Sequence, residues 1–243
     1  MKKILLIVSM TMTLFVAQAY GATHWGYSGA EAPENWAKLS PEFSACAGKN
    51  QSPINLTKFI EAELNPIAFS YVPGPASVIN NGHTIQVDDS DGGSITLDGT
   101  KYYLKQFHFH APSENLINGK SYPLEVHLVH ADKEGNLAVV AVMFTEGAEN
   151  SLLAKIWPLM PHKTGDKKSL PFEVQASGLL PVDRDYFRYN GSLTTPPCTE
   201  GVVWLVMKTP LTASKSQIEE FSHLMHHPNN RPVQPVNARP VLQ

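Results

Sequence analysis

The sequence predicts a β-sheet protein that forms one domain with a few peripheral helices. Short segments rich in β-branched and aromatic residues recur along most of its 243 residues. Nineteen prolines and sixteen glycines indicate many turns rather than a helical bundle. No internal repeat, low-complexity tract or linker-like stretch marks a boundary, so we expect one domain.

Six segments carry the strand pattern, and most of them are bounded by Gly, Pro, Asn or Asp. They are HTIQV (83–87), SITL (94–97), YYLKQFHFH (102–110), LEVHLVH (124–130), LAVVAVMF (137–144) and GVVWLVM (201–207). The last two are almost wholly apolar, which predicts strands buried on both faces.

Three short segments carry helix signals. Ser214 and Gln217 form a capping box at the start of IEEFSHLM. Asn150 precedes the run LLAKIW, which Pro158 ends. Pro33 suits the first position of a short PENWAKL turn.

The first 19 residues predict a secretory signal peptide. Two lysines precede an apolar stretch from Ile4 to about Val16, and Ala17-Gln18-Ala19 supplies the small residues of a cleavage site. The apolar stretch is shorter than the ~20 residues of a membrane helix, although a single N-terminal anchor remains the alternative. We therefore expect residues 20–243 to be a soluble domain in the periplasm or outside the cell, with no membrane insertion after cleavage.

The charge of that domain excludes some partners. Without Lys2 and Lys3, 17 basic residues face 22 acidic ones, a formal charge of −5. No run of Lys or Arg occurs, so nucleic acids and anionic membranes are not expected to bind.

The two cysteines are expected to pair in an exported protein. Cys46 and Cys198 enclose about 150 residues, and closing such a loop stabilises by roughly 4–5 kcal/mol in the chain-entropy model. Two free buried thiols are the alternative. A bond at Cys198 would anchor the preceding segment LTTPP (193–197).

Strand alternation gives the histidines a geometry. His108 and His110 share one face of their strand, while the phenylalanines between and before them take the other face. If the segment 124–130 is the antiparallel neighbour, His127 lies opposite this pair and His130 points away. Three imidazoles with an open fourth position are the usual catalytic zinc site. Gln106 and Glu125 offer the acceptors that orient such imidazoles. An ordinary strand with polar histidines is the alternative.

These residues belong to a longer series of motifs that resembles the α-class carbonic anhydrases from His24 to Asn237. The matching motifs are HWGY (24–27), NQSPIN (50–55), NNGH (80–83), QFHFH (106–110), SEN (113–115), EVHLVH (125–130), LAVV (137–140), GSLTTPPC (191–198), EGVVW (200–204) and RPVQPVN (231–237). The resemblance implies a single domain around a large, twisted and mostly antiparallel central sheet, with zinc at the base of a conical cavity.

The resemblance also implies a role for each matching residue. The zinc ligands are His108, His110 and His127, and Gln106 and Glu125 are their acceptors. A further pair, Thr194 and Glu114, forms a relay: the threonine hydroxyl accepts a hydrogen bond from zinc-bound hydroxide and donates one to the buried glutamate. Cys46 and Cys198 match a disulfide of exported members.

The substrate side is implied in the same way. Val129, Val139, Leu193 and Trp204 align with the apolar wall where carbon dioxide sits, although plain core packing explains such residues as well. Thr195 borders the same site and can help to hold bicarbonate.

The implied reaction is the reversible hydration of carbon dioxide to bicarbonate and a proton by attack of zinc-bound hydroxide. His83 matches the residue that passes the proton to solvent, and Tyr27 matches a residue that orders the intervening water. An imidazole with an ordinary pKa near 6.5 can carry protons in both directions at neutral pH. The partners implied are small molecules, with a homodimer left open.

Two positions depart from the animal enzymes, which carry tryptophan at Ala111 and an aromatic residue at Asn230. Three other interpretations remain open at this point. His108, His110 and Glu114 imitate a cupin metal motif, but the spacing to Gly119 is short and His127 is left unexplained. A non-catalytic binding module related to carbonic anhydrases is the second. The third concerns a separate group of histidines: His223, His226 and His227. They could store zinc, or they could simply be solvent-exposed residues at the end of a helix.

Overall fold

The computed structural model of the protein describes residues 23–89 and 91–243. The predicted signal peptide, residues 1–19, lies outside this described part. Within it, no helix is long and apolar enough to cross a membrane.

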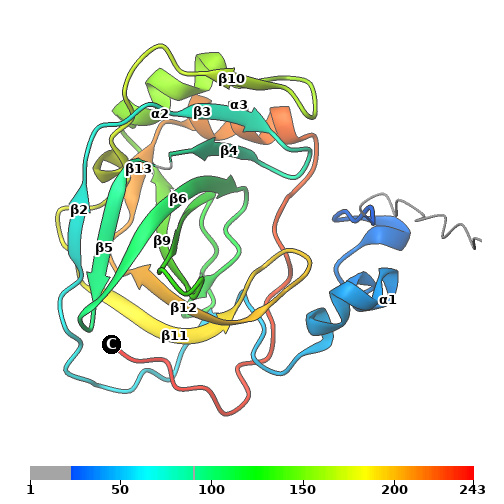
Figure 1. Ribbon diagram of the computed structural model, residues 1–243. Helices are drawn as coiled ribbons and strands as arrows, with labels where there is room; N and C mark the ends of the chain where they lie inside the picture. The colour runs from blue at the N-terminus through cyan, green and yellow to red at the C-terminus, as the bar shows by residue number, and fades with distance from the viewer. Residues whose placement is uncertain (1–22, 90) are drawn as a thin grey trace, which may run out of the picture.

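One 11-stranded sheet runs through the molecule and curls strongly, as Figure 1 shows. Its strands are β2 (Ala68–Tyr71), β3 (Ser77–Asn80), β4 (Ile85–Asp88), β5 (Gly93–Leu97), β6 (Thr100–His110), β8 (Leu124–Ala131), β9 (Leu137–Glu146), β10 (Lys167–Ser169), β11 (Tyr186–Ser192), β12 (Glu200–Met207) and β13 (Leu211–Ala213). The main order is β10-β3-β4-β6-β8-β9-β12-β11, with β5 on β6, β2 on β5, and β13 on β9. All pairs are antiparallel except β12 and β13 against β9. The mainly β, mostly antiparallel, single-domain prediction is confirmed.

A second, two-stranded parallel sheet joins the connection between β6 and β8 to an earlier part of the chain. It pairs β1 (Asn55–Leu56) with β7 (Leu116–Ile117). This contact fixes the segment after β6 against a distant part of the chain.

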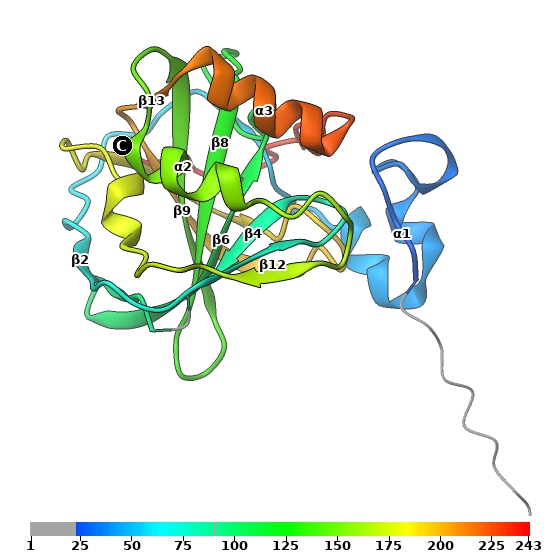
Figure 2. The same ribbon diagram turned by 90° about the horizontal axis from the view of Figure 1, so that it is seen from above.

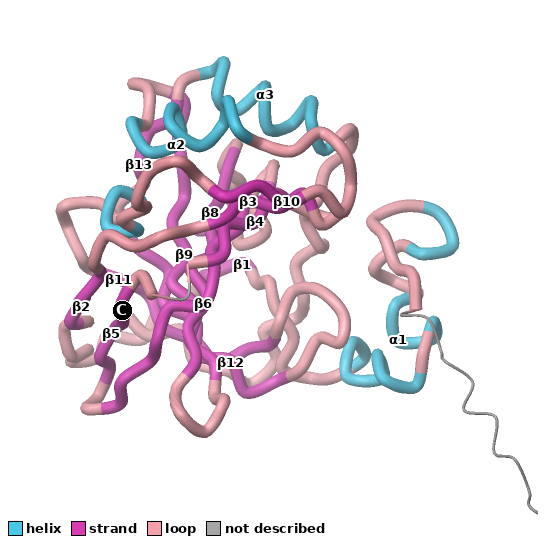
Figure 3. Tube along the Cα trace, turned by 45° about the horizontal axis from the view of Figure 1, so that its top comes forward, coloured by secondary structure: helices cyan, strands magenta, loops and turns pink. Residues whose placement is uncertain are grey.

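The helices are short and peripheral, as predicted. They are α1 (Trp36–Leu39), α2 (Ser151–Ile156) and α3 (Lys215–Met225), with 3-10 turns at Gly29–Glu31, Pro41–Ala47, Trp157–Leu159 and Ala176–Leu179. Figures 2 and 3 show α2 and α3 along one side of the sheet, and α1 apart from them beside it. The capping box of Ser214 and Gln217 is present at α3, and the Asn150 side chain accepts from two backbone N–H groups at the start of α2.

The central strands are buried on both faces, which confirms the interpretation of the apolar segments. Alternate residues of β9 enter two different clusters: Val140 and Val142 pack with the residues under α2 and α3, and Val139 and Ala141 pack with Trp204. A third cluster joins α1 and the following 3-10 turn around Trp36, Phe43 and the cysteines. The sheet thus has a helix-covered face and a second face that carries the histidines.

The predicted strand 83–87 was wrong at its start, since β4 begins at Ile85. The side chain of Asn81 accepts hydrogen bonds from the backbone N–H groups of His83 (2.9 Å) and Thr84 (2.9 Å). Gly82, between Asn81 and His83, adopts a positive φ of 86°. This turn satisfies the backbone locally, as Asn-Gly sequences often do, and lifts His83 out of the strand.

Cys46 and Cys198 form the predicted disulfide, and the two residues are 152 positions apart. The bond ties the turn after α1 to the segment that follows β11. Within the described part of the chain, no free cysteine remains.

Candidate active site

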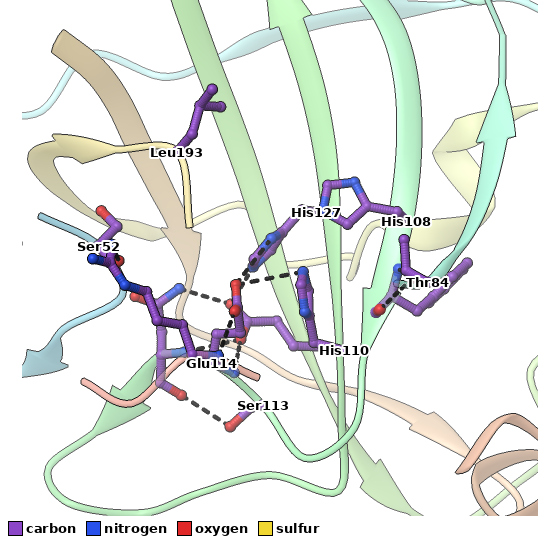
Figure 4. Close-up of polar contacts among 12 residues, drawn as sticks. Ser52, Thr84, His108, His110, Ser113, Glu114, His127 and Leu193 are labelled. Atoms are coloured by element: carbon purple, nitrogen blue, oxygen red, sulfur yellow. Dashed lines mark hydrogen bonds and ion pairs between the residues drawn. The ribbon is translucent and has the colours of Figure 1, made fainter. Parts of the chain in front are cut away.

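Three imidazoles meet on β6 and β8. His108 of β6 lies directly opposite His127 of β8, and His110 lies opposite Glu125. One ring nitrogen from each histidine falls within 4.8 Å of the others. His110 and His127 are each only 1% exposed, and Figure 4 shows both imidazoles directed toward Glu114. The predicted convergence of the three histidines is confirmed.

The second nitrogen of each imidazole already has a neighbour. Nδ1 of His108 lies 2.8 Å from Oε1 of Gln106, and Nδ1 of His110 lies 2.7 Å from the carbonyl oxygen of Asn229. Nε2 of His127 lies 2.9 Å from Oε1 of Glu125. These contacts leave Nε2 of His108, Nε2 of His110 and Nδ1 of His127 as the nitrogens that can bind a ligand.

This donor set fits a zinc ion. Nε2 of His110 is buried and has no hydrogen-bond partner among the described residues, which is costly for a polar atom unless something else binds there. Burial is the main cause that lowers the pKa of His108, His110 and His127, so all three imidazoles are held neutral. The neutral imidazole is the form that binds a metal.

Glu125 holds the segment after β6 in place. Its Oε2 accepts hydrogen bonds from the backbone N–H groups of Glu114 (2.7 Å) and Asn115 (3.0 Å), and its Oε1 accepts from the side-chain amide of Asn115 (2.8 Å). The same carboxylate therefore contacts His127 and fixes the backbone that carries Glu114.

Glu114 is buried beside the imidazoles. Its Oε2 lies 3.4 Å from Nε2 of His110 and 3.9 Å from Nδ1 of His127. Its Oε1 accepts a 2.8 Å hydrogen bond from the backbone N–H of Arg231. Burial raises the pKa of Glu114 well above its usual value, while the Arg231 N–H and the Thr194 side chain oppose that rise. Thr194 and Glu114 are thus neighbours, as the resemblance implied.

The segment that carries Thr194 and Thr195 is fixed at both ends. The backbone N–H of Leu193 donates to the carbonyl of Thr199 (3.0 Å), and that of Cys198 donates to the carbonyl of Thr195 (2.8 Å). The disulfide then joins Cys198 to the turn after α1.

A cavity of about 110 Å³ opens beside the imidazoles. Among the residues that line it are several that the sequence singled out: Tyr27, His83, Gln106, His108, His110 and Thr195. The ring of His83 stacks on that of Trp25, with 3.7 Å between their centres. Burial, followed by the charges of His24 and His227, lowers the pKa of His83. The hydroxyl of Tyr27 is buried without a hydrogen-bond partner among the described residues.

The four apolar residues expected to form the substrate wall lie together, but they are not among the residues that line this cavity. Val139 and Trp204 are buried in the second cluster, with Val129 and Leu193 packed against it at partial exposure. The rings of Trp204 and His127 are 4.8 Å apart, so the cluster adjoins the imidazoles. His130 lies on the opposite face, as strand alternation predicted, and is a fully buried core residue.

Three residues of the site were missed in the sequence. Asn229 supplies the acceptor for His110, and its side chain also accepts from the backbone N–H of Ala111 (2.9 Å). Arg231 supplies the donor to Glu114, and Trp25 supports His83. Asn229 is 119 positions from His110, so no local spacing points to it. The one available signal in the sequence was proximity to a motif: Trp25 lies in HWGY, Arg231 begins RPVQPVN, and Asn229 lies two residues before Arg231.

Comparisons with known proteins identify the family of this chain. The model of the eukaryotic-type carbonic anhydrase family matches residues 31–243. A carbonic anhydrase of Klebsiella pneumoniae is 48% identical over 99% of this chain and 96% of its own length. One from Pectobacterium carotovorum is 48% identical over the full length of both chains. The α-carbonic anhydrase of Thermovibrio ammonificans superposes with a TM-score of 0.90, at 51% identity, over 92% of this chain and all of the other. The chain therefore belongs to the α-class carbonic anhydrases.

Proposed function

We propose that the protein catalyses the reversible hydration of carbon dioxide at a zinc ion held by His108, His110 and His127. The observation that carries the proposal is the set of three converging imidazoles whose other nitrogens each have an acceptor close by. Membership of the α-class carbonic anhydrases supports the same reaction.

The zinc, when bound, supplies Lewis acidity that lowers the pKa of water toward neutrality, an effect for which carbonic anhydrases are the standard example. The chain's own contribution begins with Gln106, Asn229 and Glu125, which fix the orientation of the three rings. Such outer acceptors typically change metal affinity or activity by roughly 10- to 100-fold when removed.

Thr194 and Glu114 orient the nucleophilic oxygen. A hydroxyl has a single proton, so if Thr194 donates it to the Glu114 carboxylate, its oxygen can only accept. Whatever faces Thr194 must then donate a proton, which selects the nucleophile's orientation and rejects groups without a proton. The N–H of Arg231 favours the charged carboxylate that this arrangement needs.

Carbon dioxide is apolar, and the cluster of Val129, Val139, Leu193 and Trp204 offers an apolar surface next to His127. Thr195, which lines the cavity, is placed to contact a polar product such as bicarbonate. Binding the substrate weakly on an apolar surface while the polar product faces the cavity favours release to water.

The proton leaves through the cavity. His83 lines the cavity together with His108 and His110, and stacking on Trp25 orders its ring. Tyr27 lines the same cavity, its buried hydroxyl has no hydrogen-bond partner among the described residues, and it can order water between His108 and His83. We further propose export by the signal peptide at residues 1–19, which the disulfide supports.

The test is stopped-flow measurement of carbon dioxide hydration by the purified protein with a pH indicator. We expect rapid hydration that sulfanilamide blocks, because the Thermovibrio ammonificans relative was solved in complex with that inhibitor. Hydration no faster than buffer, by a folded protein that retains zinc, would reject the proposal and favour a non-catalytic binding module.

A further inference from the structure

A hollow on the described surface lies away from the site, beside α3. It has a volume of about 510 Å³. Its lining combines buried or half-buried apolar residues, Trp157, Met160 and Leu224, with an exposed rim of polar side chains that includes potential metal ligands: His162, Ser216, Glu219, Glu220, His223 and His226.

Helical spacing brings part of the rim together. Glu219 and His223 are four residues apart on α3, so their side chains are neighbours on one face. His226 follows at the C-cap of α3, three residues after His223, and lines the same hollow. His162 enters from the segment after the 3-10 turn Trp157–Leu159. Three imidazoles and two carboxylates, those of Glu219 and Glu220, therefore line one space.

These side chains are exposed, and their present contacts are weak. Among the described residues, the one ion pair at this rim joins Glu219 to Lys215 at 3.7 Å, with both side chains more than half exposed. Pairs of this kind contribute little to stability. His227, although it neighbours His226, lies elsewhere: its ring is 5.9 Å from that of Tyr27. The C-terminal histidines thus separate into two groups.

We propose that His162, His223 and His226, with Glu219, form a second metal site that binds a divalent transition ion. Imidazole and carboxylate donors suit Zn²⁺, Ni²⁺ and Cu²⁺, and Cu²⁺ binds such sites most tightly. Among the described residues, only His108, His110 and His127 already have their nitrogens within 4.8 Å of one another, so the side chains of the second site must rotate toward one another to bind an ion. Exposed side chains rotate freely, and ordering them weakens binding. The second site is therefore weaker and more exchangeable than the first.

The experiment adds Cu²⁺ to the zinc-loaded protein. Equilibrium dialysis followed by elemental analysis counts both metals, and electron paramagnetic resonance of Cu²⁺ reports its nitrogen ligands. We expect one bound Cu²⁺ with at least two nitrogen ligands and no loss of zinc. His223→Ala and His162→Ala should each weaken Cu²⁺ binding by about tenfold or more, since even outer-shell partners change metal affinity this much. Carbon dioxide hydration in the zinc-loaded variants should be unchanged.

Two control variants locate the ion. His227→Ala removes a neighbouring histidine outside the hollow and should leave Cu²⁺ binding intact. His24→Ala tests the other exposed histidine group, near His83 and Glu31. The proposal is overturned if His223→Ala binds Cu²⁺ as the native protein does, if binding is lost in His24→Ala instead, or if Cu²⁺ enters only by replacing zinc.

Discussion

His108 of β6 and His127 of β8 lie directly opposite each other in antiparallel register. Two of the three imidazoles are therefore placed by a strand pair in the middle of the sheet, and the third, His110, lies two residues along the same strand. No flexible loop positions these rings, which gives a metal site little freedom to relax. Glu114, Thr194 and His83, by contrast, lie outside the strands, and they provide the clearest tests.

The Thr194–Glu114 pair is tested by Glu114→Gln. This change keeps the shape of the side chain but replaces a carboxylate, which only accepts hydrogen bonds, by an amide that also donates them. We expect the kcat/KM for carbon dioxide to fall by about 10²-fold, the usual loss when a group that orients charge in the transition state is removed. Thr194→Ala should cost a similar factor, and the double variant little more, because the two residues act as a unit. Stopped-flow kinetics measures all three.

Zinc content is the control for this pair, since neither residue is proposed as a ligand. Variants that keep zinc and retain native kcat/KM would show that the pair does not orient the reaction.

Proton transfer is tested by His83→Ala. Because proton release follows the chemical step, we expect kcat to fall by at least roughly tenfold in dilute buffer while kcat/KM is unchanged. Added imidazole should restore kcat. A parallel change at Trp25, such as Trp25→Leu, should give a partial loss, because the stacked ring orders His83. Equal losses in kcat and kcat/KM for His83→Ala would place this residue in the chemical step instead.

The dependence of stability on pH is tested at His130. This imidazole is fully buried, its Nε2 lies 2.7 Å from the hydroxyl of Tyr71, and burial lowers its pKa to about 4. The unfolded chain binds a proton at His130 near pH 6.5, before the folded protein does, so stability is lost as the pH falls from about 6.5 to 4. The full loss is roughly 3 kcal/mol.

The measurement compares metal-free native protein with metal-free His130→Gln by urea denaturation between pH 7 and pH 4. The native free energy of unfolding should fall more steeply than that of the variant. Identical slopes would mean that the protonation of His130 is not linked to folding.

The disulfide is tested by the double variant Cys46→Ser/Cys198→Ser. Closing a loop of 152 residues predicts a loss of about 4–5 kcal/mol in the free energy of unfolding, measured in denaturant. Activity should fall as well, because Cys198 ends the segment that carries Thr194 and Thr195. Reductant should reproduce both effects in the native protein and leave the variant unchanged. A variant with native stability would contradict this account of the bond.

Strand alternation and register were enough to predict the three histidines, because the period of a strand fixes which side chains share a face. The positions of Glu114 and Thr194 could be predicted only from the family resemblance, since both lie in irregular segments. The contacts of Asn229 with His110 and of Arg231 with Glu114 were missed because they are made by backbone groups, which any residue carries. The start of β4 was placed wrongly because the Asn81 side chain replaces strand pairing at His83. The remaining strands were also missed, and all but β11 have four residues or fewer, too few for a clear alternation: β1, β2, β3, β7, β10, β11 and β13.

The central claim is tested most directly by removing and restoring the metal. Carbon dioxide hydration and zinc content are measured on the native protein, after chelation, and after one equivalent of zinc is returned, with His127→Ala alongside. We predict that hydration disappears with the zinc, returns in proportion to the zinc bound, and is absent in His127→Ala at the same zinc concentration. Hydration that persists in the zinc-free protein, or that fails to return when the three histidines have rebound zinc, would contradict the account.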